Sequence, residues 1–331
     1  MLHFEGKDLR LEDGESVLDC LLRHGEQVSS LCRSGACQSC LLRATAGPIP
    51  PIAQLGLKDA WKQQGFLLSC VCRPQADLAL ERCDAAMSYA TVVNSVTQLA
   101  PSVVGVRLAR PVDFEFNPGQ FVQLSRPGDG LMRPYSIASL PSEDELELHV
   151  ALLANGQMSG WLREAQGQGV SLRGPFGECS YQHGEPERPL VLAGTGTGLA
   201  PLIGVLRTAA LHGHRGEISL FHGSPRLSGI YLRGELEALV ESLPGLRLFG
   251  SLLSGSKEEL RAQGRWQFEI SPLEQVVFSR YPKFDVHRLF VCGDPSLVKT
   301  LRKRAYLAGA SLSRIHSDAF AAPHSAVRAP T

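Results

Sequence analysis

The sequence predicts a chain of three parts: a small cysteine-rich α+β unit, an antiparallel β-barrel and a parallel α/β domain. Three observations support this. Seven of the nine cysteines lie in the first quarter of the chain. The middle contains short alternating strands broken by Gly and Pro, as in antiparallel barrels. Beyond it, continuous apolar runs alternate with helix-like stretches, the rhythm of a parallel sheet. We place the three parts at residues 1–85, 88–186 and 187–322, with a loose tail at 323–331.

The bulk composition is that of an ordinary globular protein. Hydrophobic residues make up 44% of the 331 residues and charged residues 20%, and the formal net charge is zero. A nucleic-acid-binding protein would normally carry a basic domain. No apolar run approaches the roughly 20 residues that span a bilayer, and the first residues lack the basic and apolar regions of a signal peptide. We therefore expect a cytoplasmic protein that binds no nucleic acid.

The first part opens with a predicted hairpin and a helix. Residues 2–4 and 8–11 alternate in polarity around a turn near Gly6. Ser16 is a candidate N-cap for a short helix that ends at Gly25. These short elements lead into a loop that is rich in cysteine.

The cysteine loop has a specific spacing. Cys32, Cys37 and Cys40 give C-x4-C-x2-C, and Cys70 lies further along the chain. This is the spacing of plant-type [2Fe–2S] centres, whereas zinc sites usually pair their ligands as two C-x2-C units. The small residues between the cysteines allow backbone N–H groups to approach the sulfurs. The spacing predicts an iron–sulfur cluster, with Cys72 as the rival of Cys70 for the fourth ligand.

The motif resembles the plant-type ferredoxin domains, which have a β-grasp fold. In those domains the fourth ligand lies in a Leu-x-Cys stretch like Leu68-Ser69-Cys70, so the resemblance favours Cys70 over Cys72. We expect Cys20 and Cys83 to be small core residues. The implied cluster ligands are Cys32, Cys37, Cys40 and Cys70.

A second motif stands at the start of a predicted barrel strand. Arg133-Pro134-Tyr135-Ser136 offers a cation, a flat aromatic ring and a hydroxyl group within four residues. Successive strand residues face opposite ways, so Arg133 and Tyr135 share one face and Ser136 turns to the other. Alone, the tetrapeptide also fits a strand tyrosine beside a surface arginine.

A third motif precedes a predicted helix at residues 155–162, where Gly156 and Ser159 stand close together. The free N–H groups of a helix N-terminus suit a pyrophosphate. An ordinary N-cap by Ser159 is the alternative.

Together, the second and third motifs resemble the ferredoxin–NAD(P)H reductase family, over about residues 88–320. The resemblance implies a bound FAD, with Arg133 on the flavin phosphate, Tyr135 stacked on the isoalloxazine and Ser136 hydrogen-bonded near N5. The other residues that it places at the flavin are Pro134, Gly156, Gln157, Met158 and Ser159.

A glycine-rich loop follows the first apolar strand of the third part, and a helix is predicted after it over residues 202–211. Glycines allow a phosphate to come close to the backbone, and the dipole of the following helix favours the anion. Pro201 stands where the dinucleotide fingerprint would have its third glycine, and the reductase family has this same Gly-x-Gly-x-x-Pro loop. The residues expected to bind NAD(P)H are Gly194, Thr195, Gly196, Thr197, Gly198 and Pro201.

Two further segments match the reductase family near the nicotinamide. Its Cys-Gly-x-Pro turn corresponds to Cys292-Gly293-Asp294-Pro295, after another buried strand. We expect Cys292 to pack and position the hydride-transfer site, although many cysteines are simply buried. The aromatic residue that covers the flavin corresponds to Phe320. The residues implied closest to the chemistry are Ser136, Cys292 and Phe320.

The order of the parts resembles the reductase components of bacterial multicomponent oxygenases. That resemblance implies electron flow from NADH through FAD to the cluster and on to an oxygenase or another one-electron acceptor. Leu253-Ser254 resembles the NADH-using members, although Arg226 and Arg233 leave NADPH open. Two alternatives remain: a reductase that acts on a small molecule such as a deoxysugar intermediate, and a redox sensor or relay subunit with little turnover.

Overall fold

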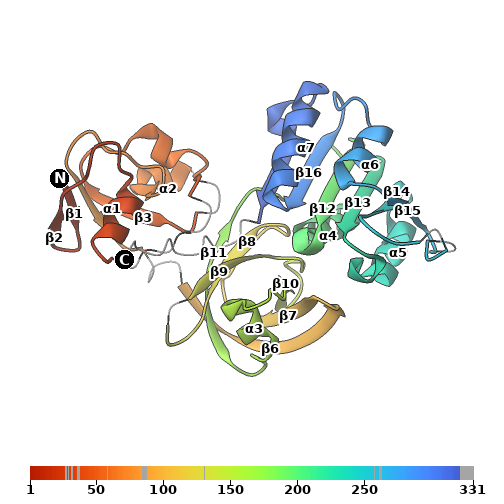
Figure 1. The fold of residues 1–331 in the computed structure, drawn as a ribbon, viewed down its shortest axis with the longest axis horizontal. Helices are drawn as coiled ribbons and strands as arrows, with labels where there is room; N and C mark the ends of the chain where they lie inside the picture. The colour runs from red at the N-terminus through yellow and green to blue at the C-terminus, as the bar shows by residue number, and fades with distance from the viewer. Residues whose placement is uncertain are drawn as a thin grey trace. The chain divides into compact units, whose positions relative to one another are not determined.

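The computed structural model describes residues 1–26, 28, 30, 33–35, 38–57, 59–83, 88–129, 131–256, 258–260 and 263–320. These residues form two compact units, Met1–Ser88 and Tyr89–Phe320 (Figure 1). The predicted tail at 323–331 lies outside them. Within this described part, no helix has the length and apolar character of a membrane span.

The first unit is a five-stranded mixed sheet in the order β2-β1-β5-β3-β4, as expected for a β-grasp domain. The hydroxyl oxygen of Ser16 accepts the Asp19 N–H at 3.2 Å, so Ser16 is the predicted N-cap. The helix ends at Arg23 rather than at Gly25, and its apolar side packs on the sheet. The elements are β1 (Leu2–Phe4), β2 (Lys7–Leu9), α1 (Val17–Arg23), β3 (Leu41–Ala46), η1 (Pro51–Gln54), α2 (Asp59–Gln63), β4 (Phe66–Leu68) and β5 (Leu78–Glu81).

The second unit begins with a six-stranded antiparallel sheet in the order β10-β7-β6-β11-β8-β9. A bridge between Ile137 and Leu148 joins the segment after β9 to β10, so the two edges of the sheet meet as in a barrel. Apolar side chains from all around the sheet fill its interior. The elements are β6 (Ser88–Ala100), β7 (Val103–Ala109), β8 (Phe121–Ser125), β9 (Met132–Ser136), β10 (Glu145–Ala151), α3 (Gln157–Arg163) and β11 (Gly169–Phe176).

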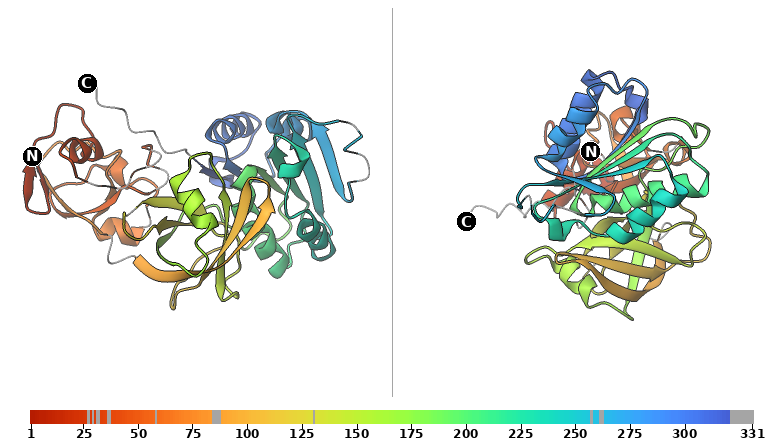
Figure 2. Two further views of the ribbon diagram at one scale, coloured as in Figure 1. Left: turned by 60° about the horizontal axis from the view of Figure 1, so that its bottom comes forward. Right: turned by 90° about the vertical axis from the view of Figure 1, so that its right-hand side faces the viewer.

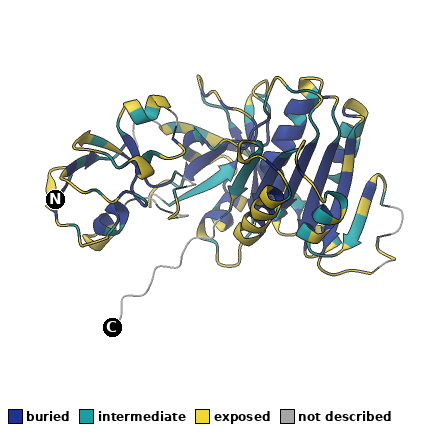
Figure 3. Cartoon of the chain, turned by 90° about the horizontal axis from the view of Figure 1, so that it is seen from above, coloured by how far each residue is buried: buried dark blue, intermediate teal, exposed yellow. Residues whose placement is uncertain are grey.

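A parallel six-stranded sheet follows, in the order β15-β14-β13-β12-β16-β17. Helices α4 and α5 cover one face, and α6 and α7 cover the other (Figure 2). Because both faces are covered, the central strands are buried along most of their length (Figure 3). The elements are β12 (Leu190–Thr195), η3 (Gly196–Gly198), α4 (Leu199–Leu211), β13 (Ile218–Ser224), η4 (Leu227–Gly229), α5 (Arg233–Ser242), β14 (Leu246–Leu252), β15 (Trp266–Ile270), α6 (Leu273–Arg280), β16 (Arg288–Gly293), α7 (Pro295–Leu307), η5 (Leu312–Arg314) and β17 (Ile315–Ala319).

Helix α4 packs directly on the barrel. A Cβ atom on Gly204 would lie 2.8 Å from the Gly119 nitrogen and 3.1 Å from the Ile137 carbonyl oxygen. Gly119 has a φ of +94°, and a side chain there would collide with the Cys179 carbonyl. The barrel and the parallel sheet are therefore joined through backbone contacts that exclude side chains at these two glycines.

Candidate functional site

The parallel sheet has one topological switch point, between β12 and β16. From β12 the chain moves outward through β13, β14 and β15, then returns to β16 on the other side of β12. Ligands of open α/β sheets bind outside the carboxyl ends of the strands at this point. The glycine loop follows β12 and the Cys292 turn ends β16, so both predicted segments border the same crevice.

The glycine loop packs closely against the end of β16 at one glycine and has free space beside another. A side chain on Gly198 would collide with the Cys292 carbonyl, so the loop lies against the end of β16. Gly196 has a φ of +53°, and no atom lies within 4 Å of the position of its Cβ. The loop also opens α4, whose N-terminal N–H groups favour an anion. These features fit the phosphates of a dinucleotide.

The turn after β16 is tied to the glycine loop. Gly293 has a φ of +115°, and a Cβ there would lie 2.7 Å from the Thr195 hydroxyl oxygen. That oxygen accepts the Asp294 N–H at 3.2 Å. The Phe320 N–H donates to the Gly293 carbonyl at 2.8 Å. Three segments that lie far apart in the sequence therefore meet at one edge of the sheet.

The Asp294 side chain has a local role. Its Oδ1 atom accepts the N–H groups of Ser296 and Leu297 at 2.9 and 3.1 Å, so it caps α7. The hydrogen bonds from Ser296 hold the pKa of this carboxyl below its usual value. The carboxylate thereby fixes the turn that carries Gly293.

Cys292 is fully buried, with 0% of its surface exposed. Its Sγ atom lies 3.3 Å from the Sγ atom of Cys179. Burial, together with the hydrogen bond to Cys179, raises the Cys292 pKa well above its usual value. The thiol is therefore protonated at neutral pH and packs rather than reacts. The sequence singled out Cys292 but gave no sign of its contact with Cys179.

The Arg133–Ser136 motif forms most of β9 and ends it, rather than starting a strand as the sequence indicated. Tyr135 lies opposite Val122 and Arg133 opposite Leu124 on β8. Burial raises the pKa of the Tyr135 hydroxyl, so the phenol stays neutral. Arg133 and Tyr135 are partly exposed on their shared face, whereas Ser136 is buried.

β9 is nearly an edge strand, because its other neighbour is reached only through the Ile137–Leu148 bridge. Pro134 is therefore tolerated within it. A cation beside a partly exposed aromatic ring suits a phosphorylated ring system such as FAD.

The turn before α3 differs in detail from the expected pattern. The N-cap residue is Gly156, so the alternative that Ser159 is an ordinary N-cap is wrong. The Ser159 hydroxyl accepts the Leu153 N–H at 3.2 Å and donates to the Gly156 carbonyl at 3.3 Å, which closes the turn. A side chain on Gly156 would collide with that hydroxyl. Met158 is buried in the barrel core and Gln157 begins the helix.

In the first unit, two predicted cluster ligands lie close in the fold. Cys40 and Cys70 are both buried, and the Ser69 N–H and hydroxyl donate to the Cys40 carbonyl at 3.1 and 2.8 Å. Cys32 and Cys37 lie outside the described residues. Among the residues that are described, no three Cys, His, Asp or Glu side chains gather as a metal site.

The other cysteines of this unit have core positions. Cys72 and Cys20 belong to the apolar cluster beneath the sheet. Burial raises the Cys72 pKa to about 12, which disfavours the thiolate that iron binding needs. The buried Cys83 thiol donates to the Leu41 carbonyl at 3.3 Å. These surroundings favour Cys70 over Cys72 as a ligand.

The structure also gathers polar residues that the sequence analysis missed. Glu147 and His149 on β10 contact Arg207 of α4 and Tyr231, while His222 of β13 contacts the glycine loop. In the sequence, only the spacing of Glu147 and His149 indicated such a group, because residues two positions apart on a strand place their side chains on the same face.

Comparison with known proteins assigns all three parts. Residues 2–75 match the 2Fe-2S iron-sulfur cluster binding domain, residues 91–181 the oxidoreductase FAD-binding domain and residues 192–303 the oxidoreductase NAD-binding domain. The reductase subunit of an aromatic O-demethylase from Amycolatopsis sp. is 30% identical, with 95% of this chain and 96% of the relative covered. Reductase component 1 of terephthalate 1,2-dioxygenase from Comamonas sp. is 28% identical, with 97% of each covered.

The crystal structure of an Amycolatopsis cytochrome P450 reductase is similar over 96% of this chain and 98% of that one. The TM-score is 0.67 and the sequence identity 27%. The order of strands in the three sheets and the three matched domains lead to the same assignment. The chain belongs to the ferredoxin reductase family whose members join an N-terminal [2Fe–2S] domain to FAD-binding and NAD-binding domains.

Proposed function

We propose that this oxidoreductase takes a hydride from NADH onto FAD and passes single electrons through its [2Fe–2S] cluster to a partner oxygenase. The observation that carries the proposal is the presence of all three cofactor-binding domains in one chain, in the order cluster, FAD, NAD. The relatives named above, reductases of an aromatic O-demethylase and of a terephthalate dioxygenase, support an oxygenase as the acceptor.

Residues of β9 and of the turn before α3 would hold the flavin. When bound, FAD converts two-electron hydride chemistry into one-electron transfer, and the cluster carries one electron at a time. Arg133 would neutralise a flavin phosphate, Tyr135 would pack against the ring system, and the Ser136 hydroxyl would hydrogen-bond near its reactive edge. The turn from Gly156 to Ser159 would receive the pyrophosphate.

Residues at the switch point would hold the nicotinamide cofactor. The loop from Gly194 to Gly198 would bind its phosphates, and Pro201 would fix the first turn of α4. Cys292 and Gly293 would position the nicotinamide, and Phe320 would occupy its place beside the flavin until the cofactor arrives. Hydride transfer needs no general base, so no titrating side chain is assigned to the chemical step.

The cluster would be held by Cys32, Cys37, Cys40 and Cys70. We further propose that the protein works in the cytoplasm, where NADH is supplied and thiols stay reduced. Cell fractionation followed by detection of the chain with an antibody tests this location.

Anaerobic titration with NADH, followed by visible spectroscopy, tests the function. We expect the flavin band to bleach first and the cluster absorbance to follow, and we expect fast turnover with cytochrome c or ferricyanide. Rapid bleaching with slow turnover would instead identify a sensor. A protein that binds flavin and iron but is reduced by neither NADH nor NADPH would contradict the proposal.

A further inference from the structure

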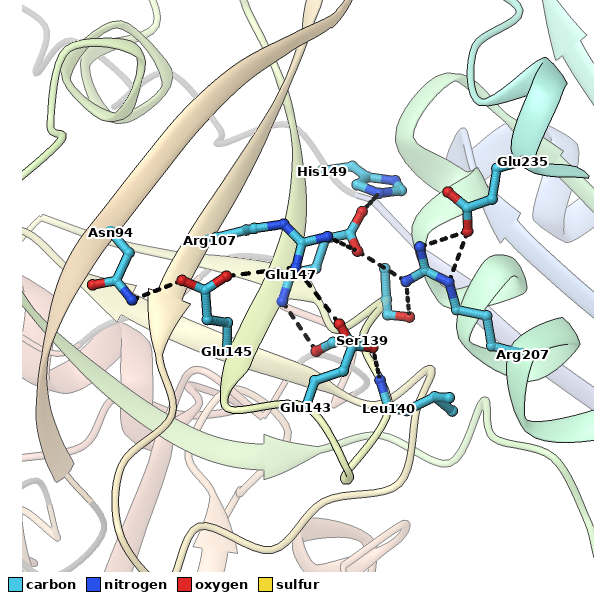
Figure 4. A network of polar contacts seen from close by, with 11 residues as sticks. Asn94, Arg107, Ser139, Leu140, Glu143, Glu145, Glu147, His149, Arg207 and Glu235 are labelled. Carbon is cyan, nitrogen blue, oxygen red and sulfur yellow. Dashed lines mark hydrogen bonds and ion pairs between the residues drawn. The ribbon is translucent and has the colours of Figure 1, made fainter. Parts of the chain in front are cut away.

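A buried carboxylate lies where the barrel meets the nucleotide-binding domain. Glu147 of β10 is only 5% exposed, yet it faces three cationic or hydrogen-bonding side chains (Figure 4). Its Oε2 atom lies 2.9 Å from Arg207 Nη1 and 3.1 Å from Arg107 Nη2, and its Oε1 atom lies 3.1 Å from His149 Nε2. Burial alone would raise the pKa of Glu147, but His149 and Arg207 lower it to about 2, so the carboxylate is charged.

Arg207 connects this carboxylate to two helices. It projects from α4, the helix that the glycine loop opens, and donates to the Ala138 carbonyl at 2.8 Å. Its Nη2 atom also lies 2.6 Å from Glu235 on α5. Helix α4 is thereby held to the barrel by a charged pair in addition to the glycine contact at Gly204.

From His149 the contacts continue into the nucleotide-binding domain. The Nδ1 atom of His149 lies 3.0 Å from the Tyr231 hydroxyl, which precedes α5. The Tyr231 ring meets the His222 ring edge to face, with centroids 5.4 Å apart. The side chains of His149, Tyr231 and His222 are all buried, so the contacts between them are shielded from water.

His222 ends this sequence of contacts at the glycine loop. Its Nε2 atom lies 3.1 Å from the Gly196 carbonyl oxygen. Burial lowers the His222 pKa to about 4, so the ring is neutral at neutral pH. A carbonyl oxygen only accepts hydrogen bonds, so Nε2 carries the proton and donates it.

Holding one carbonyl fixes a whole peptide unit. In a planar trans peptide the C=O and N–H groups point in opposite directions. When His222 holds the Gly196 carbonyl, the Thr197 N–H points away from the His222 ring. The Leu199 N–H donates to the same carbonyl, so His222 is the side-chain donor of two that hold it. Gly196 is in the left-handed region with open space beside it and adds no side chain of its own to this restraint.

We propose that His222 is a positioning residue for the dinucleotide: it orients the peptide between Gly196 and Thr197 so that the loop presents its N–H groups to the pyrophosphate. Tyr231, His149 and Glu147 hold His222 in place from the barrel side. This inference rests on the proposed function, because that function assigns the loop to NADH.

The test compares two amide replacements of His222 in the full chain with its cofactors. In His222→Gln the amide nitrogen reaches the place of Nε2 and still donates, whereas in His222→Asn the amide is too short. We expect the Asn variant to weaken NAD⁺ binding about fivefold, the size of one lost hydrogen bond. We expect the Gln variant to stay within about twofold of the wild type. ADP-ribose, which has the pyrophosphate but no nicotinamide, should show the same ratios, and kcat at saturating NADH should change little.

His214 provides a matched control in the same domain. It is buried and its Nδ1 atom lies 3.0 Å from the Tyr181 hydroxyl, in a different set of contacts. His214→Asn should leave NAD⁺ and ADP-ribose binding unchanged. Equal binding by both His222 variants and the wild type, or equal weakening by all three variants, overturns the positioning role. If the wild type itself is not reduced by NADH, the proposed function fails, and the inference fails with it.

Discussion

The Sγ atoms of Cys179 and Cys292 lie 3.3 Å apart, although 113 positions separate the two residues in the chain. Cys179 follows the last barrel strand, and Cys292 lies in the strand that leads to the proposed nicotinamide turn. Both thiols are buried. The contact therefore joins the end of the barrel to the turn on which the hydride donor would rest.

Cys292→Ala should slow flavin reduction by NADH about tenfold, which corresponds to about 1.4 kcal/mol of lost transition-state stabilisation. The reason is that the loss of the buried thiol frees the turn beside Gly198. Stopped-flow spectroscopy at saturating NADH measures the rate. Cys179→Ala removes the same thiol contact from the other side and should have a smaller effect. Equal slowing by both variants would show that the thiol contact matters rather than the turn.

The fourth cluster ligand can be decided between two neighbouring cysteines. Cys70→Ser should abolish the visible absorbance of the cluster and lower the iron content, because a thiolate ligand is lost. Cys72→Ser should keep the cluster and mainly destabilise the domain, since Cys72 lies in its apolar core. Iron and sulfide analysis of both proteins measures the result. Loss of iron in the Cys72 variant with retention in the Cys70 variant would reverse the assignment.

Two glycines of the loop that we propose to bind the dinucleotide should respond differently to alanine. Gly198→Ala places Cβ against the Cys292 carbonyl, so the backbone must move and NADH binding should be lost. Gly196→Ala meets no atom within 4 Å, and its only penalty is the left-handed backbone, about 1–2 kcal/mol. Fluorescence titration with NADH and thermal unfolding measure the two effects. Comparable losses in the two variants would mean that loop conformation, rather than collision, governs binding.

The stability of the second unit should fall in mild acid because of His222. Its folded-state pKa is about 4, against 6.5 as the ordinary value. Between these pH values the unfolded chain takes up a proton that the folded chain does not, so stability present above pH 6.5 is lost as the pH falls toward 4. The full loss is about 3 kcal/mol.

His222→Gln should remove this part of the pH dependence. Thermal unfolding of the wild type and the variant at a series of pH values from 7 to about 4.5 measures the difference. An identical slope in the two proteins would show that His222 does not contribute.

The ability of the protein to use NADPH in place of NADH should depend on Arg226. Arg233 is engaged elsewhere, since it donates to the Gln263 side chain at 2.7 Å, and the Ser254 hydroxyl donates to the Pro225 carbonyl at 3.1 Å. Arg226 is exposed on the segment after β13. Arg226→Ala should lower kcat/KM for NADPH by about tenfold, the size of a charge-assisted phosphate contact, and leave that for NADH within about twofold. Steady-state assays with both donors measure this, and a larger loss with NADH would contradict it.

Motifs that are local in sequence were predictable. The cysteine spacing, the Arg133–Ser136 strand and the glycine loop each depend on residues that are close along the chain. The β-barrel and the parallel sheet followed from alternation and apolar runs. The capping of α1 by Ser16 was also predictable, because a cap acts within one helical turn.

Elements with weak local signals were missed or misplaced. The edge strand β15 has only Trp266 fully buried, so it shows no clear alternation. Helix α4 begins at Leu199 rather than at Leu202, because Pro201 is tolerated in a first turn where no N–H is needed. The contacts of Cys179, His149 and His222 join residues far apart in the chain, so only tertiary packing reveals them.

The close contact between Gly119 of the barrel and Gly204 of α4 limits which FAD-binding and NAD-binding domains can be combined in one chain. A recombinant chain that joins this barrel to the nucleotide-binding domain of a relative would cut between residues 176 and 190, in the link between the two sheets. The cut would separate Glu147 and His149 from Arg207 and Tyr231. The four positions should therefore be exchanged together. A chimera in which both contacts, Glu147 with Arg207 and His149 with Tyr231, are kept should fold, whereas a chimera that replaces one partner of either contact should not.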